Sequence, residues 1–189
     1  MVLGRFEESL RESKLYVELD PVSAAAYDHL GFHYVTDGQN DLAILALQKA
    51  AQLDPSWEGG YRDLGNAYRR KGMAQEALHQ YEQAMRVDGV EPQSIEALRR
   101  AFSSGGWSGY WRESLNQQLR NSQHRYVDPY GIAVLNALLG DKENAFRYLD
   151  LAYSSHDDSL AYIRADYDLS SLHTDSRYSA LLQRMRLPQ

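Results

Sequence analysis

Two histidines stand four residues apart in the sequence, His29 and His33, and Asp37 follows after the same interval. In an α-helix this spacing places the three side chains on one face, where imidazole and carboxylate groups can ligate a metal ion. No glutamate follows the first histidine, so the His-Glu-x-x-His motif of zinc proteases is absent. The spacing of the histidines is by itself a weak signal for a metal site. We therefore expect no metal and no other cofactor, with metal binding as the weaker alternative.

The sequence lacks the residue combinations on which catalysis usually depends. It contains no Gly-rich phosphate loop, no nucleophile elbow and no cysteine, and its acidic residues show no pairing beyond helix faces. The absence of cysteine also excludes a disulfide framework and a Cys-ligated zinc site. We therefore expect no catalytic residues, and a protein that is not an enzyme.

Composition narrows the classes of partner. Among 189 residues, 26 acidic side chains outnumber 20 basic ones, and the formal charge is -6. A nucleic-acid-binding surface needs a surplus of lysine and arginine, so we expect no direct binding of nucleic acid. No run approaches the roughly 18 consecutive apolar residues of a membrane span, and residues 1–10 lack the pattern of a signal peptide. We expect a cytoplasmic protein that does not associate with membranes.

A regular repeat organises the chain. Glycines recur at a constant spacing of 34 residues, at Gly4, Gly38, Gly72, Gly106 and Gly140. A glycine at each of these points can adopt the left-handed conformation that ends one helix and begins a tight turn to the next. The spacing therefore predicts a series of helical hairpins with this period.

Two copies of the repeat carry a complete pattern of conserved residue types. The first copy reads Tyr27, Leu30, Gly31, Tyr34, Ala43, Leu47, Ala50 and Pro55, and the second reads Tyr61, Leu64, Gly65, Tyr68, Ala77, Tyr81 and Ala84. This pattern resembles the tetratricopeptide repeat (TPR) family. The resemblance implies an all-α fold, a TPR α-solenoid in which antiparallel helical hairpins form a right-handed superhelix.

Small residues in each copy would let the two helices of a hairpin approach closely. Gly31 on one first helix is predicted to face Ala43 on the helix that follows it. Gly65 and Ala77 repeat this pairing in the next copy.

Helix ends are marked by proline and serine. The pairs Asp20-Pro21 and Asp54-Pro55 are expected to end the preceding helices, because the residue before proline is pushed out of the α region. Ser23 and Ser56 are then the predicted N-caps of the following helices.

The same frame continues beyond residue 91, although Arg99 and Trp111 stand where a packing glycine and alanine are expected. We predict a single TPR-like domain over residues 1–189, in a chain that begins within a repeat. Its parts are a half repeat, second helix only, at 1–23, repeats at 24–57 and 58–91, degenerate repeats at 92–125 and 126–159, and a C-terminal cap at 160–189. Within the cap we expect short helices around residues 160–164 and 176–185, with a loop between them.

The densest aromatic cluster consists of Trp107, Tyr110 and Trp111. Aromatic side chains are favoured anchors at protein interfaces. Trp111 occupies a helix-packing position of the repeat, so we expect it to fill the gap opened at Arg99. Trp107 is expected to be the more exposed tryptophan.

Residues 105–187 carry a further resemblance. The runs from Gly105 to Arg112 and from Tyr126 to Ala133 look like the C-terminal TPR region of bacterial regulators, and the tail from Asp166 to Leu182 is similar to their closing segment. That segment usually carries prolines after its aspartates, where this chain has Tyr167 and Ser176. In this group the repeats follow a winged-helix, an adenylyl cyclase or a protein kinase domain. The resemblance implies the interaction module of a larger bacterial regulatory protein.

Stacked TPR hairpins line a concave groove with their first helices. The repeat frame places Asp28 and Asp63 among the groove positions, together with the candidate binding residues. These candidates are Phe32, Arg62, Asn66, Arg69, Arg70, Arg100, Tyr130 and Val134. The four arginines are expected to hold an acidic segment or C-terminal carboxylate of a protein or peptide partner. The alternative is that the arginines are solvated and pair with acidic neighbours such as Asp63 and Glu96.

The N-terminal half repeat suggests a second function. Its helix lacks the other helix of a hairpin, and Phe6, Leu10 and Val17 lie on its apolar side. An exposed apolar side can be covered by a second copy of the chain. We therefore expect a protein-protein interaction scaffold, with homodimerisation as the alternative.

Overall fold

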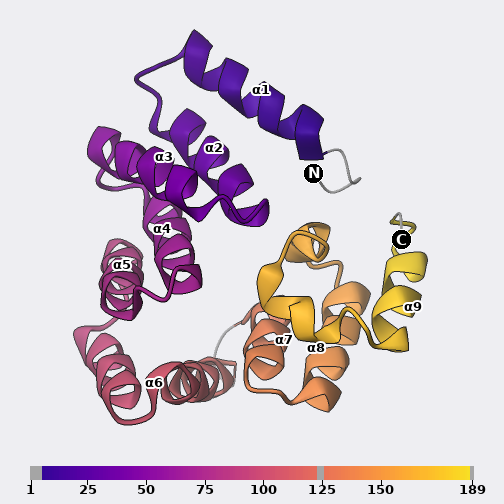
Figure 1. Ribbon diagram of the computed structural model, residues 1–189. Coiled ribbons are helices and arrows are strands. Elements are labelled where there is room, and N and C mark those ends of the chain that lie inside the picture. Colours follow the sequence, from indigo (N-terminus) through magenta and orange to yellow (C-terminus); the bar gives the residue numbers. More distant parts are fainter. Residues whose placement is uncertain (1–5, 123–125, 188–189) are drawn as a thin grey trace. The chain divides into compact units, whose positions relative to one another are not determined.

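Helices make up all the regular structure in the computed structural model, which describes residues 6–122 and 126–187 (Figure 1). In chain order the elements are α1 (Phe6–Leu19), α2 (Ala24–Thr36), α3 (Asn40–Leu53), α4 (Glu58–Arg70), α5 (Ala74–Val87), α6 (Pro92–Asn121), α7 (Pro129–Leu138), α8 (Lys142–Ser154), the 3-10 helices η1 (Asp158–Tyr162) and η2 (Tyr167–Leu172), and α9 (Ser176–Arg184). The all-α class expected from the sequence is confirmed. None of the helices in these ranges has both the length and the apolar character that crossing a membrane requires.

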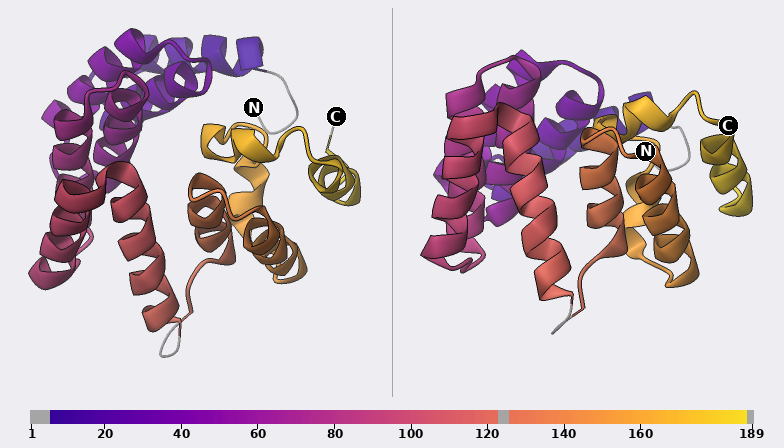
Figure 2. Two further views of the ribbon diagram at one scale, coloured as in Figure 1. Left: turned by 60° about the horizontal axis from the view of Figure 1, so that its bottom comes forward. Right: turned by 90° about the horizontal axis from the view of Figure 1, so that it is seen from below.

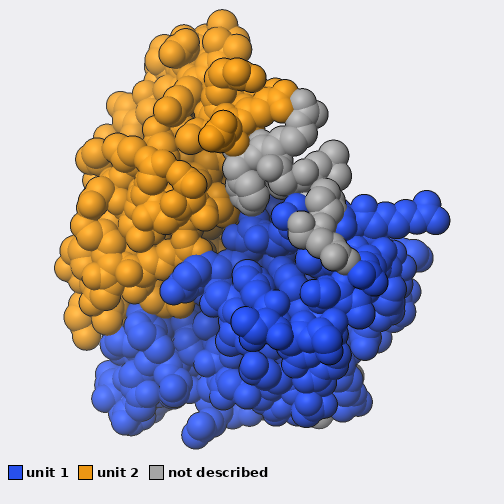
Figure 3. All heavy atoms as spheres, turned by 45° about the vertical axis from the view of Figure 1, so that its right-hand side comes forward, with its two compact units in different colours: residues 1–4, 96–189 blue, residues 5–95 orange. Residues whose placement is uncertain are grey.

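Two compact units divide the chain, the N-terminal unit of residues 5–95 and the C-terminal unit of residues 96–189 (Figure 3). The boundary lies inside α6, after Ile95. In the N-terminal unit α2 packs against α3 and α4 against α5, and the two hairpins are joined by packing of α3 on α4. Helix α1 packs on α2.

The turns of the repeat lie where the glycine spacing predicts them. Gly38 and Gly72 both have φ near 75°, Gly106 has φ 59° and Gly140 has φ 80°. These values lie in the left-handed region that favours glycine, so the four turn predictions are confirmed. Gly4, the remaining member of the series, lies outside the described residues.

Helix pairs in the N-terminal unit approach most closely at two helical glycines. A Cβ atom added at Gly31 would lie 2.4 Å from Cγ of Leu47, and one at Gly65 would lie 2.7 Å from the ring of Tyr81. The sequence predicted these glycines correctly but paired them with alanines. The large side chains of the second helices fill the space instead, and the backbone carbonyl of Ala77 lies 3.3 Å from the Gly65 position.

Helix ends agree with the sequence at three of four predicted points. Helices α1 and α3 end directly before Asp20-Pro21 and Asp54-Pro55. Ser23 caps α2, since its hydroxyl accepts a hydrogen bond from the Ala26 amide at 3.2 Å. The prediction for Ser56 is wrong, because the chain turns first. Ser56 donates its amide and its hydroxyl to the Asp54 carboxylate at 2.9 and 2.6 Å, and α4 starts one residue later without a side-chain cap.

Helix α6 consists of two helical halves that meet at Gly106. A Cβ atom at Gly109 would lie 2.2 Å from the carbonyl oxygen of Ala101, so these residues make the close backbone contact beside the turn. The packing positions predicted by the repeat frame, Arg99 and Trp111, are not the residues of this contact. A glycine displaced by two residues from Trp111 takes over the role of the expected alanine.

Aromatic rings around the α6 turn stack on one another. Trp107 lies parallel to Trp111 with ring centroids 5.3 Å apart, and Phe102 meets Trp107 edge-on at 4.8 Å. Tyr110 packs edge-on against Trp111 and is only 5% exposed. Both tryptophans are half-buried. The rings of Trp107 and Trp111 cover each other, and which of the two is the more exposed stays a prediction.

In the C-terminal unit α7 and α8 form a hairpin and lie alongside each other (Figure 2). Aspartate side chains start each of the helical elements from α7 onward by accepting a backbone N–H of the first turn. These caps are Asp128, Asp141, Asp157, Asp166 and Asp175. The repeated use of aspartate fixes the starts of five closely spaced helical elements in one small unit.

Residues after α8 cover the apolar side of the α7/α8 hairpin. Helix η1 packs on α8, η2 on α7 and α9 on α8. Leu169 and Leu172 of η2 are fully buried, and the hydroxyl of Tyr178 in α9 donates to the carbonyl of Ile163 at 2.9 Å. The sequence predicted a loop between two short helices here, which is wrong because burial of the two leucines winds the segment into η2.

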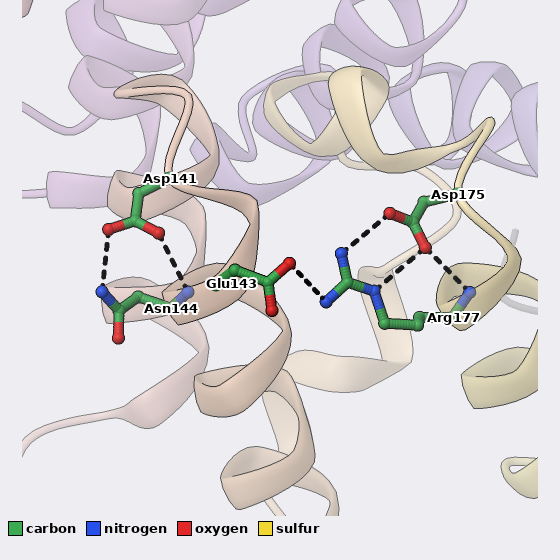
Figure 4. Close-up of polar contacts among 5 residues, drawn as sticks. All are labelled: Asp141, Glu143, Asn144, Asp175 and Arg177. Atoms are coloured by element: carbon green, nitrogen blue, oxygen red, sulfur yellow. Dashed lines mark hydrogen bonds and ion pairs between the residues drawn. The ribbon is translucent and has the colours of Figure 1, made fainter.

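A guanidinium group connects α9 to α8 (Figure 4). Arg177 donates to Asp175 at 2.9 and 3.0 Å and to Glu143 at 2.9 Å. The same group lies 4.2 Å from the ring centre of Phe146, within cation–π range. Hydrogen bonds from Arg177 lower the pKa of Asp175 to about 2. The last helix is thus held by a bidentate ion pair as well as by apolar packing.

We expect Gly31→Ala to destabilise the N-terminal unit by about 1–3 kcal/mol, because the new methyl group overlaps Leu47. Urea unfolding followed by circular dichroism measures the change. Gly105→Ala is the matched control, since no atom lies within 4 Å of the added Cβ. Equal stability of the two variants would contradict the packing described for α2 and α3.

Candidate protein-binding face

The eight predicted binding residues divide between the two units, so each set is described within its own unit. Phe32 lies on α2, and Arg62, Asn66, Arg69 and Arg70 lie on α4. Helices α2 and α4 pack against each other, and residues at intervals of three, four and seven share one side of a helix. We call this surface the α2–α4 face. Its residues are Asp28, Phe32, Arg62, Asp63, Asn66, Arg69 and Arg70.

Arg62 forms ion pairs with acidic residues at the start and at the end of the segment that forms the α4/α5 hairpin. It forms an ion pair with Glu58 one turn earlier in α4, and a second with Asp88 at 3.2 Å, directly after α5. The Arg62 side chain remains 58% exposed. The sequence alternative that the arginines pair with acidic neighbours therefore describes Arg62 well.

Asn66 belongs to a chain of hydrogen bonds that crosses from α4 to α5. The hydroxyl of Tyr81 donates to the Asn66 side-chain oxygen at 2.7 Å and accepts from Nε of Arg69 at 3.1 Å. The Asn66 amide nitrogen donates to Asp63 at 3.4 Å. These bonds fix the orientation of the Asn66 amide before any ligand arrives.

Arg70 and Phe32 lie at the α2 side of this surface. The Arg70 guanidinium donates to the backbone carbonyl of Val35, the residue before the last of α2. Phe32 is half-buried and meets the ring of His33 edge-on at 6.1 Å between centroids. The structure thus gives Arg62, Arg69 and Arg70 acceptors within the protein itself.

Asp28 is the most unusual residue of the face. It is only 9% exposed, and its Oδ1 atom accepts no hydrogen bond. The carboxylate lies at the start of α4, where a Cβ at Gly59 or Gly60 would stand 3.6 or 3.7 Å from its oxygens. Burial raises the pKa of Asp28, although a hydrogen bond from Trp57 and the charge of His29 oppose this. The positive end of the α4 dipole favours a carboxylate at this position.

Asp63 is the second carboxyl group of the face, one turn after Gly59. Burial raises its pKa to about 7, and the negative charges of Asp28 and Glu58 add to the effect. Arg62 and the hydrogen bond from Asn66 lower the pKa by less than these raise it. The group is therefore about half protonated at neutral pH. The repeat frame identified both aspartates as groove positions, but only their three-dimensional neighbours reveal this chemistry.

Three predicted residues lie in the C-terminal unit. Arg100 is exposed and lies 3.9 Å from Glu96 in an ion pair, and Val134 is half-buried against the core. Tyr130 is only 7% exposed, and its hydroxyl donates to Asp166 at 2.8 Å. Tyr130 is thus a core residue rather than a surface contact, because the cap folds over the ring.

Two carboxyl groups converge on one amide at the start of α7. The backbone N–H of Tyr130 points to Asp128 at 2.8 Å and to Asp157 at 3.2 Å. Burial, together with the hydrogen bond that protonated Asp128 donates to Asp157, raises the pKa of Asp128 to about 6. Burial also acts on Asp157, but hydrogen bonds from Asp128 and Ser159 keep its pKa below the ordinary value. The pair shares a proton below neutral pH and joins α7 to η1.

His29 and His33, whose spacing suggested a metal site, each contact a residue of α1. His33 lies within hydrogen-bonding distance of the Ser9 hydroxyl, 3.2 Å away on α1, and His29 is exposed and packs edge-on against Tyr16. Burial lowers the pKa of His33. In the parts of the chain that the structure describes, no group of three or more histidine, aspartate or glutamate side chains is placed to hold a metal ion.

Comparison with known proteins gives three findings. A family model of the tetratricopeptide repeat matches residues 24–56, which contain α2, α3 and the start of the following connection. The small glutamine-rich tetratricopeptide repeat-containing protein 2 of Mycosarcoma maydis is 32% identical over 88 residues, which are 47% of this chain and 24% of that protein. A solved structure described as Naa15/Naa10 bound to HypK-THB covers 97% of this chain and 32% of its own at 15% identity, with a TM-score of 0.47.

The matched repeat coincides with a hairpin whose turn and packing glycines lie at the predicted positions. This confirms the predicted all-α fold of TPR hairpins. The chain spans about a quarter of the length of the fungal relative, since the match covers 24% of that protein.

The raised pKa of Asp63 predicts how stability depends on pH. Between about pH 4 and pH 7 the folded chain keeps a proton that the unfolded chain loses, so stability falls as pH rises through this window. Asp63→Asn imitates the protonated group and keeps an acceptor for Asn66. We expect the variant to be more stable than the wild type by about 4 kcal/mol at pH 8 and equally stable below about pH 3. Urea unfolding at both pH values measures this, and a gain that did not vary with pH would disprove the assignment.

Proposed function

We propose that the chain is a protein-protein interaction scaffold that binds a peptide or protein partner on the α2–α4 face. The observation that carries the proposal is the hydrogen-bonded row of Asp63, Asn66 and Arg69 on α4, the first helix of its hairpin, which Tyr81 of the second helix α5 joins together. A side-chain amide already held in one orientation can bond a peptide backbone with little further loss of entropy. Phe32 offers an apolar contact beside this row.

The comparisons support a binding role in general terms. The matched repeat and the fungal relative are both described as tetratricopeptide repeats, and stacked repeats of this kind present extended binding surfaces. A scaffold of this type works by recognition, and the proposal assigns it no catalytic residues. The resemblance of residues 105–187 is the basis for proposing further that the module serves a larger bacterial regulatory protein.

A second candidate function is self-association through α1. Leu15 and Leu19, one turn apart, are 51% and 76% exposed, and Val22 directly beyond the helix is 74% exposed. Leu10 and Val17, which the sequence suggested, are half-buried. The apolar residues available to a second copy are therefore Leu15, Leu19 and Val22.

Binding on the α2–α4 face can be tested with an array of random decapeptides and the purified chain. We expect Phe32→Ala and Asn66→Ala to weaken the strongest peptides about tenfold, since each removes one contact worth about 1.4 kcal/mol. Gln75→Ala, an exposed substitution on α5, is the control. Peptide binding that survives both substitutions with circular dichroism unchanged would place the binding surface elsewhere.

Self-association predicts a mass that depends on concentration. Light scattering across a concentration series should approach twice the chain mass of 21.6 kDa, and Leu19→Lys should return it to one chain mass, because a charge would be buried at the contact. A single-chain mass for the wild type at all concentrations would remove this second function.

A further inference from the structure

Charge is distributed unequally along the chain. The formal charge of -6 lies wholly on residues 5–95, because residues 96–189 contain equal numbers of acidic and basic side chains. Within the N-terminal unit, carboxyl groups gather at the start of α4. This acidic cluster consists of Asp28, Glu58, Asp63 and Asp88. The negative surplus of the whole protein therefore belongs to the unit that carries the α2–α4 face.

Arg62 is the basic residue that pairs with the acidic cluster, through Glu58 and through Asp88 at 3.2 Å. Its charge also acts on Asp63, while His29 acts on Asp28 from the next position of α2. One guanidinium cannot balance several carboxylates. Burial, to which the charges of Asp28 and Glu58 add, keeps Asp63 partly protonated in the free protein.

Asp28 supplies an independent observation. More than nine-tenths of this side chain is buried, and Oδ1 accepts no hydrogen bond from the protein. A buried carboxylate oxygen without a donor is rare in folded proteins and points to a missing partner. Gly59 and Gly60 stand beside the carboxylate, where added Cβ atoms would lie at ordinary contact distances of 3.6 and 3.7 Å from its oxygens. The surface is thus built around an acceptor that the chain itself does not satisfy.

We propose that the acidic cluster receives a lysine or arginine side chain of the partner that lies on the α2–α4 face. The ammonium or guanidinium donates to Asp63 and to the Oδ1 atom of Asp28, which is buried and has no donor in the free protein, and Arg62 moves aside from Glu58 and Asp88. This inference rests on the proposed function and specifies the chemistry of the partner as basic. It replaces the acidic ligand expected from the arginines alone, because those arginines already have acceptors within the protein.

Proton release follows from this mode of binding. The incoming cation favours the ionised form of Asp63, so the carboxyl proton passes to solvent as the ion pair forms. With a pKa of about 7 in the free protein, ionised Asp63 is about ten times more abundant at pH 8 than at pH 6. Affinity for a basic segment should therefore be about tenfold higher at pH 8 than at pH 6.

The test uses the full chain and four matched decapeptide pools that differ only in a central lysine, arginine, glutamine or glutamate. Fluorescence anisotropy at pH 6 and pH 8 and constant ionic strength measures affinity, and calorimetry in two buffers of different ionisation enthalpy measures proton release. We expect the lysine or arginine pool to bind best, with up to one proton released. Binding should be about tenfold weaker in Asp28→Asn, and its pH dependence should disappear in Asp63→Asn.

Glu76→Gln is the matched control, since it changes the charge by the same amount on the exposed side of α5. If Glu76→Gln lost as much affinity as Asp28→Asn, the effect would come from net charge alone, and the proposal would be overturned. Arg62→Ala distinguishes a basic ligand from an acidic one. Without the guanidinium of Arg62, a basic peptide should bind more tightly and an acidic peptide less tightly. If glutamate peptides bind best and depend on Asn66, the proposed function stands and this inference is wrong. Absence of binding to every pool would reject the inference as well.

Discussion

Close packing at two helical glycines fixes the geometry on which the N-terminal unit depends. Gly31 has no room for a side chain because Leu47 fills the space, and Gly65 is covered in the same way by Tyr81. This contact sets the distance between the two helices of each hairpin, and packing of α3 on α4 joins one hairpin to the next. As a result α2 and α4 lie in contact, and Asp28 of the first hairpin reaches the start of the second.

Tyr81 takes part both in helix packing and in the hydrogen bonds of the α2–α4 face. Its ring lies against Gly65, and its hydroxyl bonds Asn66 and Arg69 on the same helix. The residue that holds the hairpin together therefore also orients the polar row of the α2–α4 face. A surface supported in this way is rigid, which would lower the entropy lost on binding in the function proposed for it.

The C-terminal unit depends on a different set of residues. Its short helical elements follow one another closely, and an aspartate cap begins each element from α7 onward. Tyr130 shows the consequence, since its amide is held by two aspartates and its hydroxyl by Asp166, so that the ring is enclosed by the cap. A position that lines the groove in a regular repeat becomes a core position once a cap folds over it.

The sequence by itself determined the hairpins, their turn glycines and the glycines at the helix contacts, because backbone conformation and helix spacing act within one period of the chain. It also placed Phe32, Asn66 and the two aspartates on first helices. Only the tertiary structure decided that η2 is helical, that Tyr130 is buried, and which acceptors the arginines use. The charge state of Asp63 was likewise beyond the sequence, since it depends on burial and on the carboxyl groups of Asp28 in α2 and Glu58 in α4. Solvation and Coulomb interactions act through space, so residues far apart in the chain set them together.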